Sequence, residues 1–218
     1  MKEMSSRGQD CWLHRVNMIK NIVNLPSRSS GNGYKSLVKE NFKCKFDKLW
    51  LEKINLQKIG SDNLDHNKLR TYKTFKSSFT PEPYIDLVQN RNQRKFLTRF
   101  RSSAHNLDIE RLRYQNIPVG DRICKYCKHL HNYDKNIDDE FHFFNCDMFI
   151  NKIYCLKMKM EQIKPGFLQL SNENQFLTLM CPTTAQQAKL VNKFIKILFD
   201  CREKIDSGKQ PNDIFLNI

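Results

Sequence analysis

Four residues of the kinds that bind zinc, three cysteines and one histidine, fall within a short stretch of this 218-residue chain. They are Cys124, Cys127, His142 and Cys146, in the pattern Cys-x2-Cys-x14-His-x3-Cys. Zinc favours thiolate and imidazole ligands in a tetrahedron, and two close pairs joined by a loop can complete that tetrahedron without a large core. The pattern therefore predicts one zinc site, and the fold has to bring its two halves together.

The residues around the two ligand pairs predict the shape of the zinc unit, which we place at 116–150. The two-residue spacing of the first pair is typical of a tight turn whose amides donate to the thiolates. His142 and Cys146 are one helical turn apart. Three acidic residues before them favour helix initiation: Asp138, Asp139 and Glu140. We therefore expect a β-hairpin followed by a helix.

The composition of the ligand set also predicts the role of the metal. Three thiolates and one imidazole complete a tetrahedron, so no position remains for a catalytic water, and we expect structural zinc. Two histidines in the intervening loop, His129 and His131, stay open as replacement ligands. The Asp138-Asp139 pair resembles polymerase aspartates, but no third carboxylate or strand pattern supports a magnesium site, so helix capping is the preferred role.

The rest of the chain shows helical periodicity, so the predicted fold class is mainly α, with bundle-like helical segments around the zinc-bound hairpin and helix. Helices are expected at 11–25, 34–59, 65–79 (with Asp65 as N-cap), 90–104, 150–163 and after Thr183. In the last helix, Thr183 to Gln186 resembles a capping box. Its expected core residues are Ala185, Ala188, Val191, Phe194, Ile195 and Leu198.

We divide the chain into four regions on these patterns. A basic helical region covers 1–64, and a second helical region, 65–115, precedes the zinc unit at 116–150. A C-terminal helical region covers 151–218.

The charge of the chain points to a polyanionic partner. There are 37 Lys and Arg against 23 Asp and Glu, a formal charge of +14. The stretch from 34 to 101 holds 16 basic and 7 acidic residues. Neutralising phosphates releases counterions, so a concentrated surplus of this kind favours nucleic-acid binding. The candidate contacts are Arg94, Lys95, Arg99 and Arg101 on one face of the expected helix at 90–104, and Lys125 in the ligand turn.

The remaining cysteines and the N-terminal residues indicate the compartment. Five cysteines lie singly and far apart, which does not suit a disulfide framework. The chain starts without an apolar signal region, and no apolar stretch approaches the length of a membrane span. We therefore expect an intracellular protein, in the nucleus or the cytoplasm, without membrane partners.

Three runs of sequence carry a resemblance to a known family. They are Leu97-Thr-Arg-Phe-Arg-Ser-Ser-Ala-His-Asn-Leu-Asp-Ile-Glu-Arg-Leu-Arg-Tyr114 with Ile117-Pro118, then Arg122-Ile-Cys-Lys-Tyr-Cys127, then Asp139-Glu-Phe-His-Phe-Phe-Asn-Cys146. Together they resemble the C-terminal zinc-binding region that follows the reverse transcriptase domain in animal non-LTR retrotransposon polyproteins. Weaker similarity at 68–75 and 82–84 extends the resemblance over about residues 65 to 150.

The resemblance implies a CCHC zinc module in a protein that handles RNA and target DNA. Cys124, Cys127, His142 and Cys146 match its ligands. Its recurrent basic positions match five residues here: Arg99, Arg101, Arg111, Arg113 and Arg122. No polymerase palm, endonuclease motif or nuclease signature accompanies them, so activity does not carry over. We expect a non-catalytic, zinc-dependent nucleic-acid-binding fragment or remnant, with RNA or DNA as ligand and a reverse-transcriptase-bearing protein as a candidate partner.

Other roles stay open at this point. The zinc unit could be a staple in a protein-interaction adaptor, with Phe141, Phe143 and Phe144 as its docking patch. A divergent nuclease would need clustered carboxylates that bind magnesium. Tyr114 and Tyr126 are candidates either to stack on an unpaired base or to pack against the zinc unit.

Overall fold

The structure is a computed structural model, and it describes residues 21, 32–56, 67–76, 78, 80–131 and 136–208. Of His129 and His131 it describes only the backbone. The chain divides into two compact units, Met1–Ile54 and Asn55–Ile218. The helix predicted at 11–25 lies outside the described residues except for Asn21. The predicted cap Asp65 also lies outside them. None of the described helices combines the length and the hydropathy that crossing a bilayer needs.

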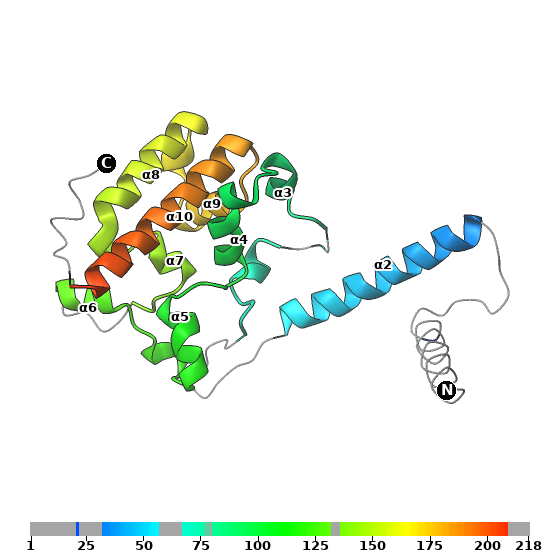
Figure 1. Ribbon diagram of the computed structural model, residues 1–218, viewed down its shortest axis with the longest axis horizontal. Coiled ribbons are helices and arrows are strands. Elements are labelled where there is room, and N and C mark those ends of the chain that lie inside the picture. The colour runs from blue at the N-terminus through cyan, green and yellow to red at the C-terminus, as the bar shows by residue number, and fades with distance from the viewer. Residues whose placement is uncertain are drawn as a thin grey trace, which may run out of the picture. The chain divides into compact units, whose positions relative to one another are not determined.

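One long helix, α2 (Asn32–Asn55), makes up most of the described part of the first unit (Figure 1). It confirms the helix predicted at 34–59, with a slightly earlier start and end. The rings of Phe42 and Phe46 stack on it with centroids 6.1 Å apart. Its apolar residues do not gather on one narrow stripe, and several are exposed: Leu37, Phe46, Leu49 and Leu51.

The second unit is built from helices and short 3-10 turns, which confirms the mainly α prediction. Its α-helices are α3 (Pro83–Leu87), α4 (Lys95–Arg101), α5 (Asp108–Arg111), α6 (Lys125–His131), α7 (Glu140–Phe143), α8 (Ile150–Ile163), α9 (Asn172–Met180) and α10 (Ala185–Asp206). The 3-10 turns are η1 (Tyr72–Thr74), η2 (Arg91–Gln93), η3 (Leu112–Gln115), η4 (Val119–Asp121), η5 (Asp147–Phe149) and η6 (Phe167–Gln169).

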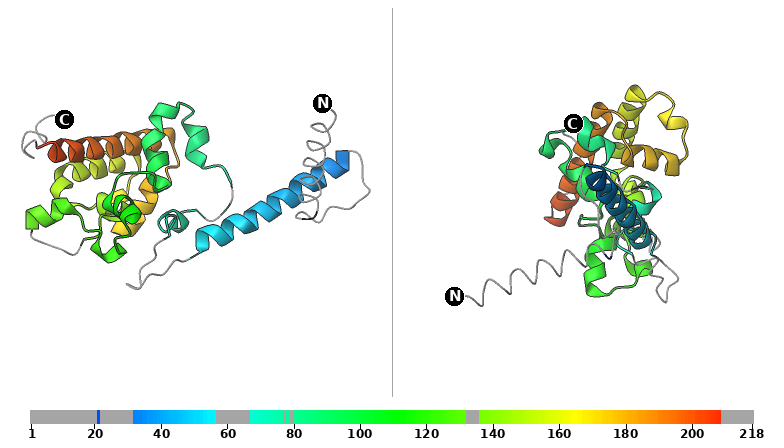
Figure 2. Two further views of the ribbon diagram at one scale, coloured as in Figure 1. Left: turned by 60° about the horizontal axis from the view of Figure 1, so that its bottom comes forward. Right: turned by 90° about the vertical axis from the view of Figure 1, so that its right-hand side faces the viewer.

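Helix α10 is the longest helix of this unit, and α4, α8 and α9 pack against it (Figures 1 and 2). Its buried apolar residues include Ala188, Val191, Phe194, Ile195 and Leu198, as predicted, whereas Ala185 is only partly buried. Residues from 65–115, 116–150 and 151–218 all contribute to one continuous core. The zinc unit therefore shares its hydrophobic core with the helices before and after it.

The start of α10 is fixed by a capping box one residue later than predicted. The Thr184 hydroxyl accepts the Gln187 amide N–H at 3.2 Å, and the Gln187 side-chain oxygen accepts the Thr183 amide N–H at 2.9 Å. The pattern Thr-x-x-Gln is thus read from Thr184 to Gln187, and the partner assigned from sequence, Gln186, is exposed.

Two predicted helices are shorter or absent. The described residues of 65–79 form turns and the single 3-10 turn η1, so the helix predicted there is wrong. In the stretch 90–104, only Lys95–Arg101 is α-helical. Helix α9, which starts after the cap Ser171, was not predicted.

The predicted β-hairpin is also wrong for the described residues. Its place is taken by an isolated antiparallel bridge between Ile123 and Ile137. Cys124 N–H donates to the Asn136 carbonyl at 2.8 Å, and Asp138 N–H donates to the Arg122 carbonyl at 2.9 Å. The pairing stops at this bridge because the chain turns into α6 immediately after Cys124.

Helix α4 begins without a side-chain cap of its own, and α10 supplies one. The side-chain oxygen of Asn192 accepts the amide N–H groups of Phe96 at 2.8 Å and Leu97 at 3.2 Å. Asn192 is 8% exposed, so these amides have little access to water. The first turn of α4 is thus fixed to α10 by a tertiary cap.

Replacing Asn192 with Leu removes this acceptor and leaves two N–H groups unsatisfied in the interior. We expect the free energy of unfolding to fall by about 2 kcal/mol, the combined scale of a lost cap and an unpaired buried donor. Urea denaturation of the purified variant measures this. Asn192→Asp keeps the acceptor and should lose less; equal losses in the two variants would contradict the capping role.

Candidate metal centre

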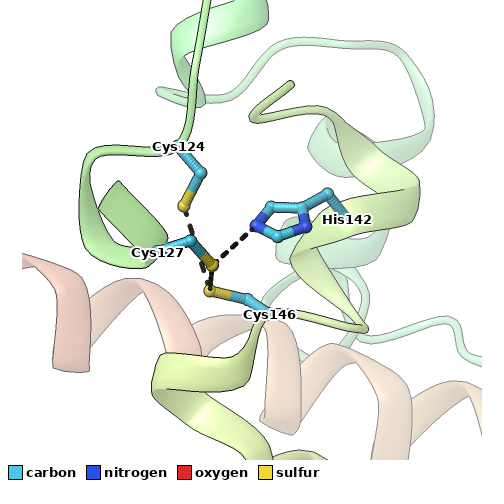
Figure 3. Close-up of side chains that lie close together, drawn as sticks. All are labelled: Cys124, Cys127, His142 and Cys146. Atoms are coloured by element: carbon cyan, nitrogen blue, oxygen red, sulfur yellow. Dashed lines mark hydrogen bonds between the residues drawn. The ribbon is translucent and has the colours of Figure 1, made fainter. Parts of the chain in front are cut away.

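The four predicted ligands come together in the structure. The Cys127 sulfur is 3.3 Å from Nε2 of His142 and 3.5 Å from the Cys146 sulfur, and the Cys124 and Cys146 sulfurs are 3.9 Å apart. All four ligand atoms lie within 4.8 Å of one another. Figure 3 shows the four side chains pointing toward a common centre. The group could hold one metal ion.

Local structure explains how each ligand reaches this centre. Cys124 follows the bridge residue Ile123, and Cys127 lies in the first turn of α6. His142 is held in the short helix α7, whose first turn is capped by the Asp139 carboxylate at 2.7 Å from the His142 amide nitrogen. Cys146 lies three residues after the end of α7, as the N-cap of η5, so the prediction that it shares a helix with His142 is wrong. The predicted capping role is therefore confirmed for Asp139.

Burial and proximity make the three thiols electrostatically dependent on one another. A hydrogen bond from Cys146 lowers the pKa of Cys124 to about 4. That same hydrogen bond, together with burial, raises the pKa of Cys146, and burial followed by the nearby Cys124 charge raises that of Cys127. The apoprotein thus favours one thiolate, because three negative sulfurs at this separation repel one another.

The geometry fits zinc. A tetrahedral site with Zn–S bonds of about 2.3 Å has edges of about 3.8 Å between sulfurs, close to the separations found here. The three cysteines are fully buried, and His142 is partly buried. With three thiolates and one imidazole, the donor set is that of a structural site, and bound zinc would compensate the thiolate charges. The His129 and His131 side chains lie outside the described residues, so their role as replacement ligands stays a prediction.

Asp138, between the two ligand pairs, forms a buried ion pair with α10. Its carboxylate receives both terminal nitrogens of Arg202, at 2.8 and 2.9 Å, and the Asp108 amide N–H at 2.9 Å. Its carbonyl accepts the Ile109 N–H at 3.2 Å. Asp138 is therefore not the helix cap predicted for it. It connects the ligand loop to α5 and to the end of α10.

The Arg202 guanidinium is next to the cysteine sulfurs. Burial opposes its charge, but the Asp138 carboxylate and the charges of Cys124 and Cys146 outweigh burial and raise the Arg202 pKa. Three rings surround the guanidinium at 4.8 to 5.7 Å from their centroids: Tyr126, Phe143 and Phe149. This cation lies in a position to stabilise negative charge on the ligand set.

Glu140, the first residue of α7, connects the site to the upstream chain. Its buried carboxylate accepts hydrogen bonds from Arg70 at 3.1 Å, Thr71 at 2.9 Å and Ser103 at 2.8 Å, and lies 2.9 Å from Nε2 of His105. Burial raises its pKa, but these partners outweigh burial and lower the pKa to about 2. Glu140 is therefore a buried anion, and it lies in the first turn of α7, where the sequence predicted a helix-initiating carboxylate.

Three of the arginines predicted to contact phosphate are either buried or hydrogen-bonded to backbone carbonyls. Arg101 is 3% exposed, pairs with Glu82 and covers the ring of Phe75. Arg122 is 2% exposed and donates to backbone carbonyls. Arg94 donates to carbonyls at the end of α3. The burial of Arg101 and Arg122 does not fit the predicted phosphate contacts, because a buried guanidinium cannot reach a nucleic-acid backbone.

The other five predicted basic residues reach the surface. Arg111, Arg113 and Lys125 each pair with a carboxylate, at 2.7, 3.0 and 2.7 Å. Lys95 and Arg99 on α4 are exposed, and neither pairs with a described carboxylate. Arg99, Arg111 and Lys125 share the lining of one groove of about 510 Å³, which also contains Asp108, Asp138, Asp200, Glu203 and Asp206. The groove is therefore of mixed charge.

The aromatic candidates separate clearly. Tyr126 is 4% exposed and its hydroxyl donates to Asp206, so it packs. Tyr114 is 75% exposed, with Arg113 4.8 Å from its ring centroid. Phe143 and Phe144 are core residues and Phe141 packs on Phe176, so these phenylalanines do not form the exposed docking patch that the adaptor alternative would need.

Comparison with known proteins finds no match to this chain among protein-family models, curated proteins or solved structures. The resemblance to the retrotransposon zinc region therefore stays a prediction.

Cys127→Ser should reduce zinc from about one ion per chain to near zero, because the variant leaves a three-ligand site in a buried centre. Elemental analysis of protein purified without chelator measures this. Cys44→Ser, at an exposed thiol on α2, is the matched control and should keep its zinc. Full zinc content in Cys127→Ser would overturn the ligand assignment.

Asp138→Asn should destabilise the fold by about 3–5 kcal/mol, because it leaves the Arg202 charge buried without its partner. Denaturation of the zinc-loaded variant measures the loss, with Asp200→Asn as the control. Asp200 pairs with Lys196 at the surface, and that change should cost less than about 1 kcal/mol. Adding Arg202→Met to Asp138→Asn should recover part of the loss; no recovery would argue against the pair.

Proposed function

We propose that this chain is a non-catalytic, zinc-dependent nucleic-acid-binding protein, a fragment or remnant of a non-LTR retrotransposon reverse-transcriptase protein. The observation that supports it most is a closed Cys3His group inside the core of a chain with a formal charge of +14. The first property favours a scaffold built on a structural metal, and the second favours a polyphosphate ligand.

A structural role for the metal follows from the ligand count. The four side chains could supply all four ligands of a tetrahedral zinc ion, and the three cysteines are buried, so a zinc bound there would have no open position for a water or a substrate. Zinc supplies folding free energy in sites of this kind. We therefore assign binding, and no chemical step, to the protein.

A reducing compartment, the nucleus or the cytoplasm, suits this proposal. The cluster needs its three cysteines as thiolates, and the other described cysteines, Cys44, Cys155, Cys181 and Cys201, are also free. RNA and DNA both remain candidate ligands, and a reverse-transcriptase-bearing protein remains a candidate partner.

Binding of the zinc-loaded chain to labelled single-stranded RNA, duplex RNA and duplex DNA across a salt series tests the proposal. The affinity should fall steeply with salt, because each neutralised phosphate contributes about 0.7 to 0.9 to the slope of log K against log salt. A chelated sample should bind at least tenfold more weakly, and the three substrates rank the preference.

No binding at low salt would overturn the proposal and would leave the charge as a solvated surface. Salt-insensitive binding to a protein partner would favour the adaptor alternative, although the phenylalanines proposed for it are largely buried.

A further inference from the structure

Three basic residues on η2 and α4 lie four residues apart along the chain: Arg91, Lys95 and Arg99. All three are exposed. Phe96, on the same helix, contacts α10 through its amide, which donates to Asn192. Arg99 lines the same groove as Phe199 and Asp200 of α10, and both η2 and α4 contact α10. These cations therefore border the junction of α4 and α10.

Helix α10 brings three lysines to the same junction. Lys189 and Lys196 lie three residues before and four residues after Asn192, so they share the helix side that meets α4. Lys193 is exposed next to Asn192. Arg99, Phe96, Phe199 and Asp200 line the same groove, and Asp200 pairs with Lys196, which links the two rows of cations.

We propose that these six residues, Arg91, Lys95, Arg99, Lys189, Lys193 and Lys196, form the surface that binds the phosphodiester backbone of a nucleic acid. We call it the α4–α10 basic face. The inference rests on the proposed function. It places the main nucleic-acid contact surface on α4 and α10 and not on the zinc unit at 116–150. None of the three α10 lysines was among the residues predicted from sequence.

Charge separation along α10 supports this location. Lys189, Lys193 and Lys196 all precede the first carboxylate of the helix, whereas the carboxylates Asp200, Glu203 and Asp206 follow them and alternate with Arg202 and Lys204. The mixed groove lies at that end of α10. A polyanion is therefore attracted more strongly to the stretch from Lys189 to Lys196 than to the end of α10 where both signs of charge occur.

Most cations of the basic face are not paired with a described carboxylate. Arg91, Lys95, Arg99, Lys189 and Lys193 form no ion pair with a described carboxylate, whereas Lys196 pairs with Asp200. By contrast, the surface cations near the zinc loop, Arg111 and Lys125, are already paired. A phosphate can bind the first group without displacing a carboxylate.

The dimensions suit a nucleic-acid strand. Lys189 and Lys196 are seven residues apart on a helix, about 10 Å at about 1.5 Å per residue. About three phosphates of one strand of a duplex cover that length at about 3.4 Å each. The lysines of α10 can therefore contact neighbouring phosphates of one strand.

Two double variants test the face in the zinc-loaded full chain. Lys189→Gln with Lys193→Gln changes α10, and Lys95→Gln with Arg99→Gln changes α4. Each should weaken binding to single-stranded RNA or duplex DNA at least tenfold at 0.1 M salt, and should reduce the salt slope by about 1.4 to 1.8. Zinc content and circular dichroism should match the parent chain.

The matched control is Lys128→Gln with Lys159→Gln, which makes the same charge change on α6 and α8, where both side chains are exposed. The control should keep its affinity within about threefold. Equal weakening in all three variants would overturn the face and leave a diffuse charge effect. Unchanged affinity in both face variants would overturn it while the proposed function stands.

Two further outcomes separate the inference from the proposed function. A parent chain that binds no nucleic acid overturns both. A parent chain that binds phosphatidylserine vesicles in preference to nucleic acid, with that binding lost in the face variants, overturns the nucleic-acid assignment and makes the face a site for an anionic membrane surface.

Discussion

The fold of the second unit depends on holding three cysteine sulfurs and one imidazole within 4.8 Å of one another. Without a cation, the thiols compete for a single negative charge, as the low pKa of Cys124 and the raised pKa values of its neighbours indicate. The ligands come from two separate stretches, each with very little regular structure. A metal bound there would add a cross-link between these two stretches to the hydrophobic contacts that they make with the shared core.

The acidic residues between the ligand pairs spread this local constraint over the whole unit. Asp138 pairs with Arg202 on α10 and Glu140 accepts from Arg70 and Ser103, so the loop is tied to both the C-terminal and the upstream chain. Buried pairs of this kind add little net stability but are costly to break. Fixing α10 in turn fixes α4 through Asn192, and thereby the spacing of the cations along the α4–α10 basic face.

Local patterns in the sequence predicted the ligand set, the long helices and the core of α10, because spacing and helical periodicity are local properties. These local patterns failed where the environment of a residue depends on a partner that is distant in the sequence. Asp138 and Arg101 look like surface charges until their partners Arg202 and Glu82 are known. The helix predicted at 65–79 gives way to turns in which Arg70 reaches Glu140. Helix α9 does have a local signal, because the cap Ser171 directly precedes it.

Hydrogen exchange of the full chain, zinc-loaded and chelated, tests the central claim most directly. If the metal centre organises the unit, chelation should remove amide protection from about residue 105 to 150 and from the last turns of α10 around Arg202, because Asp138 joins the two. The N-terminal half of α10, held by its own core, should lose much less. Equal protection over residues 105 to 150 in the two samples would contradict the account.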